Sequence, residues 1–321
     1  MMELAPIVLF AYSRPEHTLK TLMSLKDNVL ADKSILHIYI DGVKENASES
    51  LVENNRRVRE IAKSQQWCGE VIVHQSCINK GLAESIKQGV SETLKINGKI
   101  IVLEDDLFLS PAFLTFMNKS LDFYENYSAV FSIGGYTYPD KIMTIPDDYI
   151  YDTYACLRNC SWGWATWISR WDRIDWNAKQ YSTIKENNSI KLALNRMGDD
   201  EFEMFESQQE KGLNIWSILF TNYHFVNHAV AIIPCKSYVN NLGLDGSGEN
   251  CNIHNNLIHD NLNNELNPRF LDIIYEDNRI INAFYNVNCR NKRPILKKII
   301  NRIFRIFGKK SPFVLKGKVY A

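Results

Sequence analysis

Apolar residues in the first hundred positions follow two alternating patterns. Short, β-branched runs that are typical of strands occur at 7–11, 35–40, 71–75 and 100–103. The longer segments between them have apolar residues at helical spacing, and they cover 15–26, 48–65 and 82–94. Strands that alternate with helices over short links predict a parallel sheet with helices on its faces. We therefore expect an α/β, Rossmann-like fold with a mainly parallel sheet.

Each predicted strand ends in a polar, turn-forming group. These groups are Ser13-Arg14, Asp41-Gly42, Asn79-Lys80-Gly81 and Glu104-Asp105-Asp106. The carboxyl ends of parallel strands meet at one edge of a sheet, and open α/β sheets bind their ligands there. We therefore expect the four groups to converge on one binding site.

The acid triplet Glu104-Asp105-Asp106 directly follows the apolar run 100–103. Adjacent carboxylates repel one another, and a hard divalent cation bound through oxygen offsets that repulsion. Mg²⁺ or Mn²⁺ with open coordination positions also binds the phosphates of a nucleotide. On this pattern alone, a strand that runs into a solvated acidic loop explains the triplet equally well.

The order of these segments resembles the nucleotide-binding half of GT-A glycosyltransferases. The triplet is similar in particular to the Glu-Asp-Asp of N-acetylglucosaminyltransferase I and its bacterial relatives, and the chain also resembles glycosyltransferase family 2. The matching residues are Ala11 to Arg14, Asp41-Gly42, Asn79 to Leu82, Glu104 to Leu107, Gly134 to Tyr136, Ser161 to Trp167 and Pro234 to Gly248. The resemblance covers residues 5 to about 250.

The resemblance implies roles for the residues that would bind the sugar-nucleotide donor. Arg14 would neutralise the diphosphate, Asp41 would bind the base or ribose, and Asn79, Lys80 and Gly81 would approach the nucleoside. Glu104 and Asp105 would orient ribose or water, and Asp106 would bind the metal, Mn²⁺ or Mg²⁺. A surface strand cap at Arg14 and an ordinary Asp-Gly turn at Asp41 are the structural alternatives.

The resemblance also implies an acceptor side, formed by Gly135, Tyr136, Trp162, Gly163 and Asp245. An indole face suits the apolar surface of a sugar ring. Trp164, Trp167 and Trp171 follow helical spacing, so we expect them to pack in the core. The loop 245–248 would close over the donor. His254 is either a further metal ligand or an exposed side chain.

An inverting transferase needs a base that takes the proton of the acceptor hydroxyl. Relatives carry an Asp beside a tryptophan in a segment that matches Asn214-Ile215-Trp216-Ser217, where this chain has no acid. Either the base is Asp199, Asp200 or Glu201, or the alignment is offset, or the chain is catalytically weak. We choose Asp200, whose structural alternative is a solvated helix start.

Composition narrows the class of protein. With 321 residues, of which 45% are hydrophobic, the chain can bury a large core. Its seven cysteines are odd in number and show no CxxC spacing, which argues against a zinc cluster and a disulfide framework and favours the cytoplasm. No leader segment and no run of eighteen apolar residues occurs. We expect neither secretion nor a membrane span.

Charge is distributed unevenly along the chain. All 37 acids lie at or before Asp277, and twelve of the 37 basic residues follow it, so a body of net charge −12 carries a tail of +12. In the tail, apolar residues at 296, 299, 300, 303, 304 and 307 alternate with Lys297, Lys298, Arg302, Arg305 and Lys309. This pattern predicts a helix that binds an anionic membrane surface, or else one that packs on the acidic body. Nucleic-acid binding is not expected, because the excess of basic over acidic residues lies in this amphipathic tail and is not spread over a face that also carries aromatic residues.

The predicted organisation is therefore a glycosyltransferase domain, 1–278, followed by a basic amphipathic tail, 279–321. Within the domain, 1–110 would bind the nucleotide sugar and 111–278 the acceptor. The expected reaction is the transfer of a hexosyl or N-acetylhexosaminyl group, with inversion, from a UDP-sugar to a saccharide or lipid-linked acceptor in cell-surface polysaccharide synthesis. It would take place at the inner face of the plasma membrane.

Two other functions stay open. A sugar-phosphate nucleotidyltransferase would use similar acids, but it would have a Gly-rich basic loop after the first strand, where this chain has Ala11-Tyr12-Ser13-Arg14-Pro15. A non-catalytic sugar-binding homologue is suggested by the missing acid at 214–217.

Overall fold

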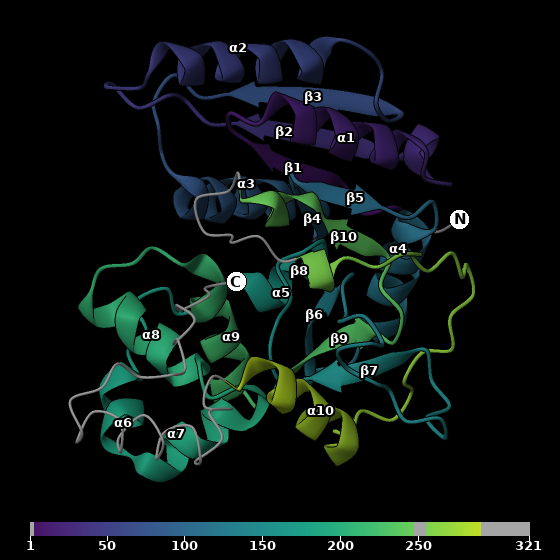
Figure 1. The fold of residues 1–321 in the computed structure, drawn as a ribbon, viewed down its shortest axis with the longest axis vertical. Coiled ribbons are helices and arrows are strands. Elements are labelled where there is room, and N and C mark those ends of the chain that lie inside the picture. The colour runs from purple at the N-terminus through teal and green to yellow at the C-terminus, as the bar shows by residue number, and fades with distance from the viewer. Residues whose placement is uncertain (1–2, 247–254, 290–321) are drawn as a thin grey trace, which may run out of the picture.

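The computed structural model describes residues 3–246 and 255–289, which form an α/β fold (Figure 1). The strands are β1 (Ile7–Ala11), β2 (Ile35–Ile40), β3 (Glu70–Gln75), β4 (Lys99–Glu104), β5 (Leu107–Leu109), β6 (Val130–Gly134), β7 (Thr153–Cys156), β8 (Trp164–Trp167), β9 (Val230–Pro234) and β10 (Val239–Asn241). The α-helices are α1 (Pro15–Lys26), α2 (Glu49–Lys63), α3 (Leu82–Asn97), α4 (Phe113–Tyr124), α5 (Ile168–Trp171), α6 (Tyr181–Glu186), α7 (Asn188–Leu194), α8 (Glu201–Glu210), α9 (Trp216–Val226) and α10 (Asn278–Asn288). The strand-helix alternation predicted for the first hundred residues is confirmed.

The central sheet has eight strands in the order β3-β2-β1-β4-β8-β6-β9-β7. The pairs β1–β2, β2–β3 and β1–β4 are parallel, whereas β8 is antiparallel to both β4 and β6, and β7 is antiparallel to β9. Six of the eight strands therefore point the same way. This confirms the α/β prediction of a mainly parallel sheet.

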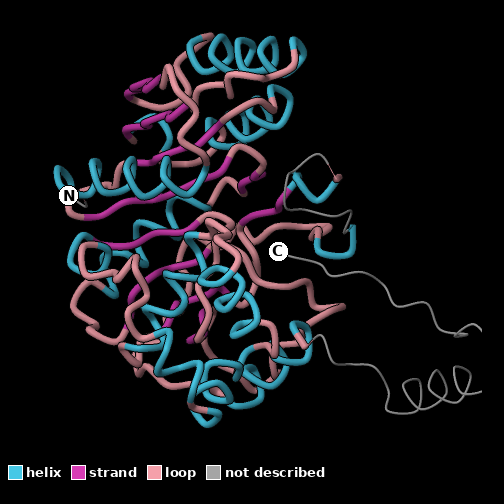
Figure 2. The backbone as a smooth tube through the Cα atoms, turned by 90° about the vertical axis from the view of Figure 1, so that its left-hand side faces the viewer, coloured by secondary structure: helices cyan, strands magenta, loops and turns pink. Residues whose placement is uncertain are grey.

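Helices cover both faces of this sheet, as the two views in Figures 1 and 2 show. Side chains alternate along each strand, so Ile38 of β2 packs in one core cluster with Leu22 of α1 and Val58 of α2. Phe10 of β1 belongs to a second cluster with Val90 of α3. Two apolar core layers, one on each face of the sheet, thus hold the carboxyl ends of β1, β2 and β4 at one edge. These strand ends can position a site.

The tryptophan segment differs from the sequence prediction. Trp164 and Trp167 lie in strand β8, not in a helix, and only Trp171 is helical. The strand forms because Lys99 and Val102 of β4 offer open pairing partners to Trp167 and Trp164. Such tertiary pairing overrides a short periodic pattern, and aromatic residues suit strands. Their predicted role in packing is confirmed, because all three side chains are buried.

A small second sheet extends the acid end of β4. β5 follows Asp106 directly and pairs antiparallel with β10, so that Asn241 lies opposite Leu107. The Leu242 amide then donates to the Asp106 carbonyl at 2.7 Å. The segment around residue 242 is thereby held against the acid triplet, although it lies far from it in sequence.

Helix α10, the last helix within residues 255–289, is part of the body. Ile280, Ile281 and Phe284 are buried in a cluster with Tyr154 and Ile233. The predicted boundary at 279 therefore falls at the start of a packed helix. The amphipathic segment of the predicted tail lies outside the described residues.

Two further findings concern membranes and thiols. In residues 3–246 and 255–289, no helix has both the length and the apolar character that a bilayer crossing requires. The cysteines that the structure describes, at 68, 77, 156, 160, 235 and 289, are free thiols.

Candidate functional site

The acids at the end of β4 share one guanidinium. Glu104 is the last residue of β4 and lies beside Phe10 of β1, and Asp105 and Asp106 form the turn that follows. Arg14, at the start of α1, pairs with Asp105 through Nη2 and with Asp106 Oδ2 through Nη1, the latter at 3.0 Å. The structure therefore brings Arg14 together with the acid triplet, as the strand-end pattern predicts.

Burial makes this cluster electrostatically demanding. It raises the pKa of Glu104 to about 8, and the neighbouring charge of Asp106 adds to the effect. Burial also raises the pKa of Asp105, although the charge of Arg14 opposes the shift. For Arg14, burial lowers the pKa, but the attraction of Asp105 and Asp106 exceeds this and raises it overall. Negative charge at this edge thus favours a bound cation.

Asp106 has the features of a metal ligand. The residue is only 4% exposed, and its Oδ1 is buried with no hydrogen-bond partner among the described residues. A buried carboxylate oxygen without a partner is costly, and a hard divalent cation would satisfy it. No set of three or more His, Cys, Asp and Glu side chains in 3–246 and 255–289 is arranged to hold a metal. Metals that bind nucleotides need only one or two carboxylates together with substrate phosphates.

Asp41 organises the loop at 79–81. Its two carboxylate oxygens accept hydrogen bonds from the backbone amides of Gly42 at 2.9 Å, Lys80 at 3.0 and 3.1 Å and Gly81 at 2.9 Å, and from the Asn79 side chain at 3.2 Å. Gly81 has φ = 78°, a left-handed conformation that glycine adopts without strain. Because a carboxylate offers about four acceptor positions, Asp41 is fully used within the chain. Its predicted contact with the donor stays a prediction.

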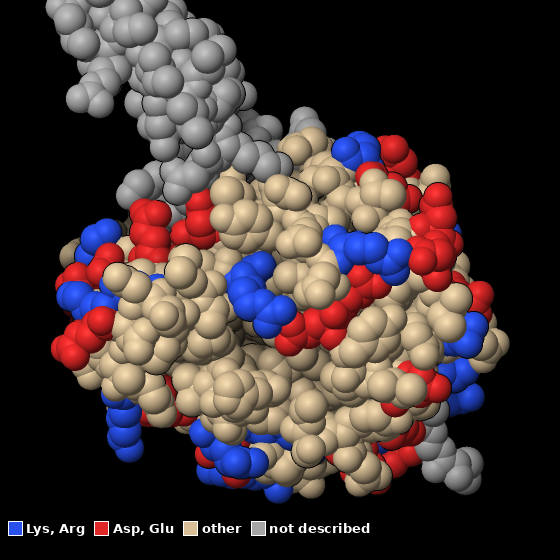
Figure 3. Space-filling model, turned by 90° about the horizontal axis from the view of Figure 1, so that it is seen from below, with Lys and Arg blue, Asp and Glu red and all other residues tan. Residues whose placement is uncertain are grey.

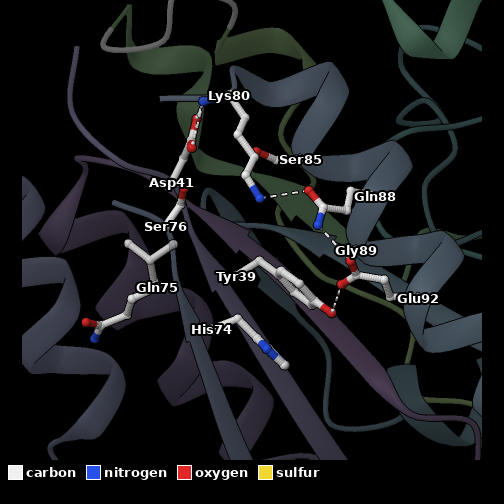
Figure 4. Close-up of a pocket in the computed structure, with 11 residues that line it drawn as sticks. Tyr39, Asp41, His74, Gln75, Ser76, Lys80, Ser85, Gln88, Gly89 and Glu92 are labelled. Carbon is white, nitrogen blue, oxygen red and sulfur yellow. Dashed lines mark hydrogen bonds between the residues drawn. The ribbon is translucent and has the colours of Figure 1, made fainter. Parts of the chain in front are cut away.

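The Lys80 side chain lies in a groove between α3 and the strands β2 and β3 (Figure 4). This α3 groove has a volume of about 170 Å³. The Lys80 ammonium donates to Gln88 at 2.7 Å, and Gln88 donates to Glu92 at 2.7 Å. The predicted role of Lys80 in donor binding stays a prediction, because the structure shows its ammonium bound to Gln88 of α3.

Two residues of α2 that sequence reasoning missed tie the strand ends together. Asn55 Nδ2 donates to the carbonyl oxygens of Tyr12, at 2.7 Å, and Asp41, at 2.9 Å. Arg59 donates to Asn55 Oδ1 at 2.8 Å and to the Ser76 carbonyl at 2.9 Å. Polar residues four positions apart are common on solvated helices, so the sequence held no signal for this clamp.

Backbone hydrogen bonds connect the predicted acceptor residues to the segment before β10, the strand that pairs with β5 beside the acids. Tyr238, which precedes β10, donates through its amide to the Gly135 carbonyl at 2.9 Å, and the Gly135 amide donates to Gly163 at 2.7 Å. Tyr136 and Trp162 meet edge to face, with ring centroids 4.5 Å apart. The structure thus brings four of the predicted acceptor residues together. Tyr136 and Trp162 form an aromatic wall in which Trp162 is half-buried and Tyr136 is buried.

Asp245 is placed elsewhere in the site. Its Oδ2 lies 3.2 Å from His17 Nε2 of α1, the helix that begins beside Arg14. It therefore lies close to the predicted donor-binding helix. The rest of the predicted lid, 247–248, and His254 lie outside the described residues.

Asp200 has the contacts of a structural acid. It lies 3.2 Å from the Arg158 guanidinium, whose Nε is 2.6 Å from Glu201. Removing one acid would leave a buried cation short of a partner, which is strongly destabilising. Asn214 is exposed just before α9, next to the buried Trp216. The role of Asp200 as the base stays a prediction.

Surface charge is mixed on the face seen from below (Figure 3). Acidic and basic side chains of the described residues are interspersed there around a broad uncharged area. The absence of nucleic-acid binding stays a prediction.

Comparisons with known proteins give distant structural similarities. No protein-family model and no curated protein matches the chain. Among solved structures it is similar to the mannosyltransferase PcManGT from Pyrobaculum calidifontis in complex with GDP-Man and Mn²⁺, with 10% identity, a TM-score of 0.37 and coverage of 53% of this chain and 48% of that one. It is also similar to S. aureus TarS, with 10% identity, a TM-score of 0.38 and coverage of 76% and 62%. An active-site mutant of LgtC shows 12% identity, a TM-score of 0.34 and coverage of 58% and 65%.

The chain thus spans from about half to two thirds of the length of these three proteins. Because the identities and TM-scores are low, we infer function from the residues of this chain.

Proposed function

We propose that this protein is a metal-dependent glycosyltransferase. It would transfer a hexosyl or N-acetylhexosaminyl group from a UDP-sugar to a saccharide or lipid-linked acceptor, with inversion, in cell-surface polysaccharide synthesis. The observation that supports this most is the buried, unpartnered Asp106 Oδ1 beside Arg14, at the edge where α/β sheets bind ligands.

The chain's residues divide the work of donor binding. Asp106 would hold Mn²⁺ or Mg²⁺, which when bound stabilises the negative charge of the leaving diphosphate. Arg14 would bind the diphosphate, because its planar fork matches phosphate oxygens. Asp41, held by Asn55, sets the backbone of 79–81 that would approach the nucleoside. Glu104 and Asp105 would orient ribose or water.

The acceptor would lie against the aromatic wall. The half-buried Trp162 would offer a ring surface that suits a sugar's C–H face, and the buried Tyr136 packs edge to face against it. Gly135 and Gly163 leave room for the Phe113 ring. A Cβ on Gly135 would lie 2.8 Å from the Phe113 ring and 3.0 Å from the Gly163 carbonyl, so larger residues do not fit.

The decisive experiment compares Asp106→Asn with the wild type in UDP-sugar binding and hydrolysis with Mn²⁺. Asn keeps the shape of Asp but removes the charge that a cation needs, so we expect loss of the Mn²⁺-dependent rise in Tm with UDP. Asp122→Asn is a matched control, because Asp122 pairs with Lys99 at 2.7 Å at the opposite end of β4. Equal UDP and Mn²⁺ binding by wild type and Asp106→Asn would refute the proposal.

A non-catalytic sugar-binding homologue is the second candidate. It is favoured by the ion pairs of Asp200 and by the lack of an acid at 214–217. In that case UDP and Mn²⁺ would raise the Tm of the wild type, but no UDP-sugar would be hydrolysed or transferred.

A further inference from the structure

One guanidinium neutralises two acids of the proposed metal site. Arg14 contacts both Asp105 and Asp106 Oδ2, and the two carboxylates are almost fully buried. A cation that is already bound in this way reduces the field that would attract a second one. Arg14 and a divalent metal therefore compete for Asp106.

The surroundings of Asp106 strengthen this competition. The backbone of Gly243 lies so close that a Cβ there would be 2.3 Å from Asp106 Oδ2 and 3.0 Å from Arg14 Nη1. The other oxygen, Oδ1, is shielded from solvent. A metal reaches this carboxylate only after the group around it has rearranged.

Arg14 is the member of this group that can move. Its side chain is 23% exposed, against 5% for Asp105 and 6% for Asp106. It extends from the start of α1, at the sheet edge that faces ligands. A diphosphate offers a guanidinium two or more oxygens in bidentate geometry, which makes it a strong alternative partner.

We propose that Arg14 makes metal and nucleotide binding interdependent: it blocks Asp106 until a nucleoside diphosphate takes its guanidinium, and the metal then binds with the diphosphate. This rests on the proposed function, since it concerns that metal and that donor. Because coupling between two ligands is reciprocal, Mn²⁺ also strengthens diphosphate binding by the same factor.

Calorimetric titration of the full chain with Mn²⁺, with and without UDP, tests this. Arg14→Met removes the charge but keeps a flexible stem. Without UDP, we expect this variant to bind Mn²⁺ on the order of tenfold more tightly than wild type, since Asp105 and Asp106 lose their bound cation. UDP should strengthen Mn²⁺ binding much more in the wild type than in the variant. Arg14→Lys, which keeps a charge but not the fork, should fall between them.

The control is Arg57→Met, which breaks an exposed pair with Glu16 (2.7 Å) and should leave Mn²⁺ binding unchanged. Circular dichroism and Tm establish that each variant is folded. Equal or weaker Mn²⁺ affinity of Arg14→Met without UDP would overturn the role of Arg14 while leaving the transferase intact. No Mn²⁺ binding by any variant, even with UDP, would overturn both proposals.

Discussion

Single buried groups determine much of the behaviour of this molecule. His224 of α9 is fully buried, and its Nδ1 lies 2.7 Å from the Phe220 carbonyl. A carbonyl only accepts, so Nδ1 carries the proton and Nε2 accepts from Ser132 Oγ at 2.9 Å. This arrangement suits the neutral imidazole and has no place for a second proton.

We therefore expect acid to destabilise the fold through His224. Burial lowers the pKa of His224 from 6.5 to about 4. The folded state then binds fewer protons than the unfolded state. The contribution of neutral His224 to the free energy of unfolding is therefore fully present above pH 6.5 and declines as the pH falls toward 4. The loss amounts to about 3 kcal/mol. Urea unfolding at a series of pH values measures it.

A matched pair of variants isolates this effect. His224→Gln should be less stable at neutral pH but should flatten the decline between pH 6.5 and 4. His228→Asn changes an exposed histidine just after the same helix and should leave the decline intact. An unchanged decline in His224→Gln would assign it to other groups.

Individual site residues were only partly predictable. The sequence places Arg14, Asp41 and the acid triplet at strand ends, and the structure has them at one edge. It did not indicate that Asp41 is used up by its own chain, because that depends on the conformation of 79–81. Nor did the sequence indicate the contact of Gly243 with Asp106. That contact depends on the pairing of β5 with β10, two strands about 130 residues apart in the chain.

Among the elements, α2 acts on the site through its buried face. Asn55→Ala removes donors to the carbonyls of Tyr12 and Asp41, two acceptors at the ends of β1 and β2. Leaving buried acceptors unsatisfied costs about 1–3 kcal/mol. We expect that loss in urea unfolding, together with weaker UDP binding, because the 79–81 backbone follows Asp41.

The neighbouring Asn54 serves as the control, since it lies on the same helix and is less buried. Asn54→Ala should change stability by less than Asn55→Ala and leave UDP affinity as it is. If both variants lose the same free energy of unfolding, the loss arises from helix propensity and not from the hydrogen bonds of Asn55 to Tyr12 and Asp41.

Elements with clear periodicity were predicted well. The helix at 15–26 and the strand at 35–40 have the predicted bounds, because each has one consistent apolar pattern between turn residues. β8 was missed because four residues are too short to show a period, and its partner strands decide its conformation.

For the molecule as a whole, the uneven charge predicts membrane association. Replacing Lys297, Lys298, Arg302, Arg305 and Lys309 by Gln should abolish flotation with vesicles that contain phosphatidylglycerol, since each basic residue near such a surface adds about 1 kcal/mol. Vesicles of phosphatidylcholine alone should bind the wild type weakly. The control replaces the exposed Arg56 and Arg57 of α2 by Gln and should leave flotation unchanged. Undiminished flotation of the Gln variant would contradict the membrane role.

The position of β8 between β4 and β6 affects how the chain folds during its synthesis. Since Trp164–Trp167 supplies the strand between β4 and β6, the sheet that carries the acids is completed by residues far beyond Asp106. During synthesis on the ribosome, β4 therefore remains an open edge until this segment has emerged, and open edges are prone to pair with other chains. The segments before and after Asp106 therefore complete this sheet together and not in succession.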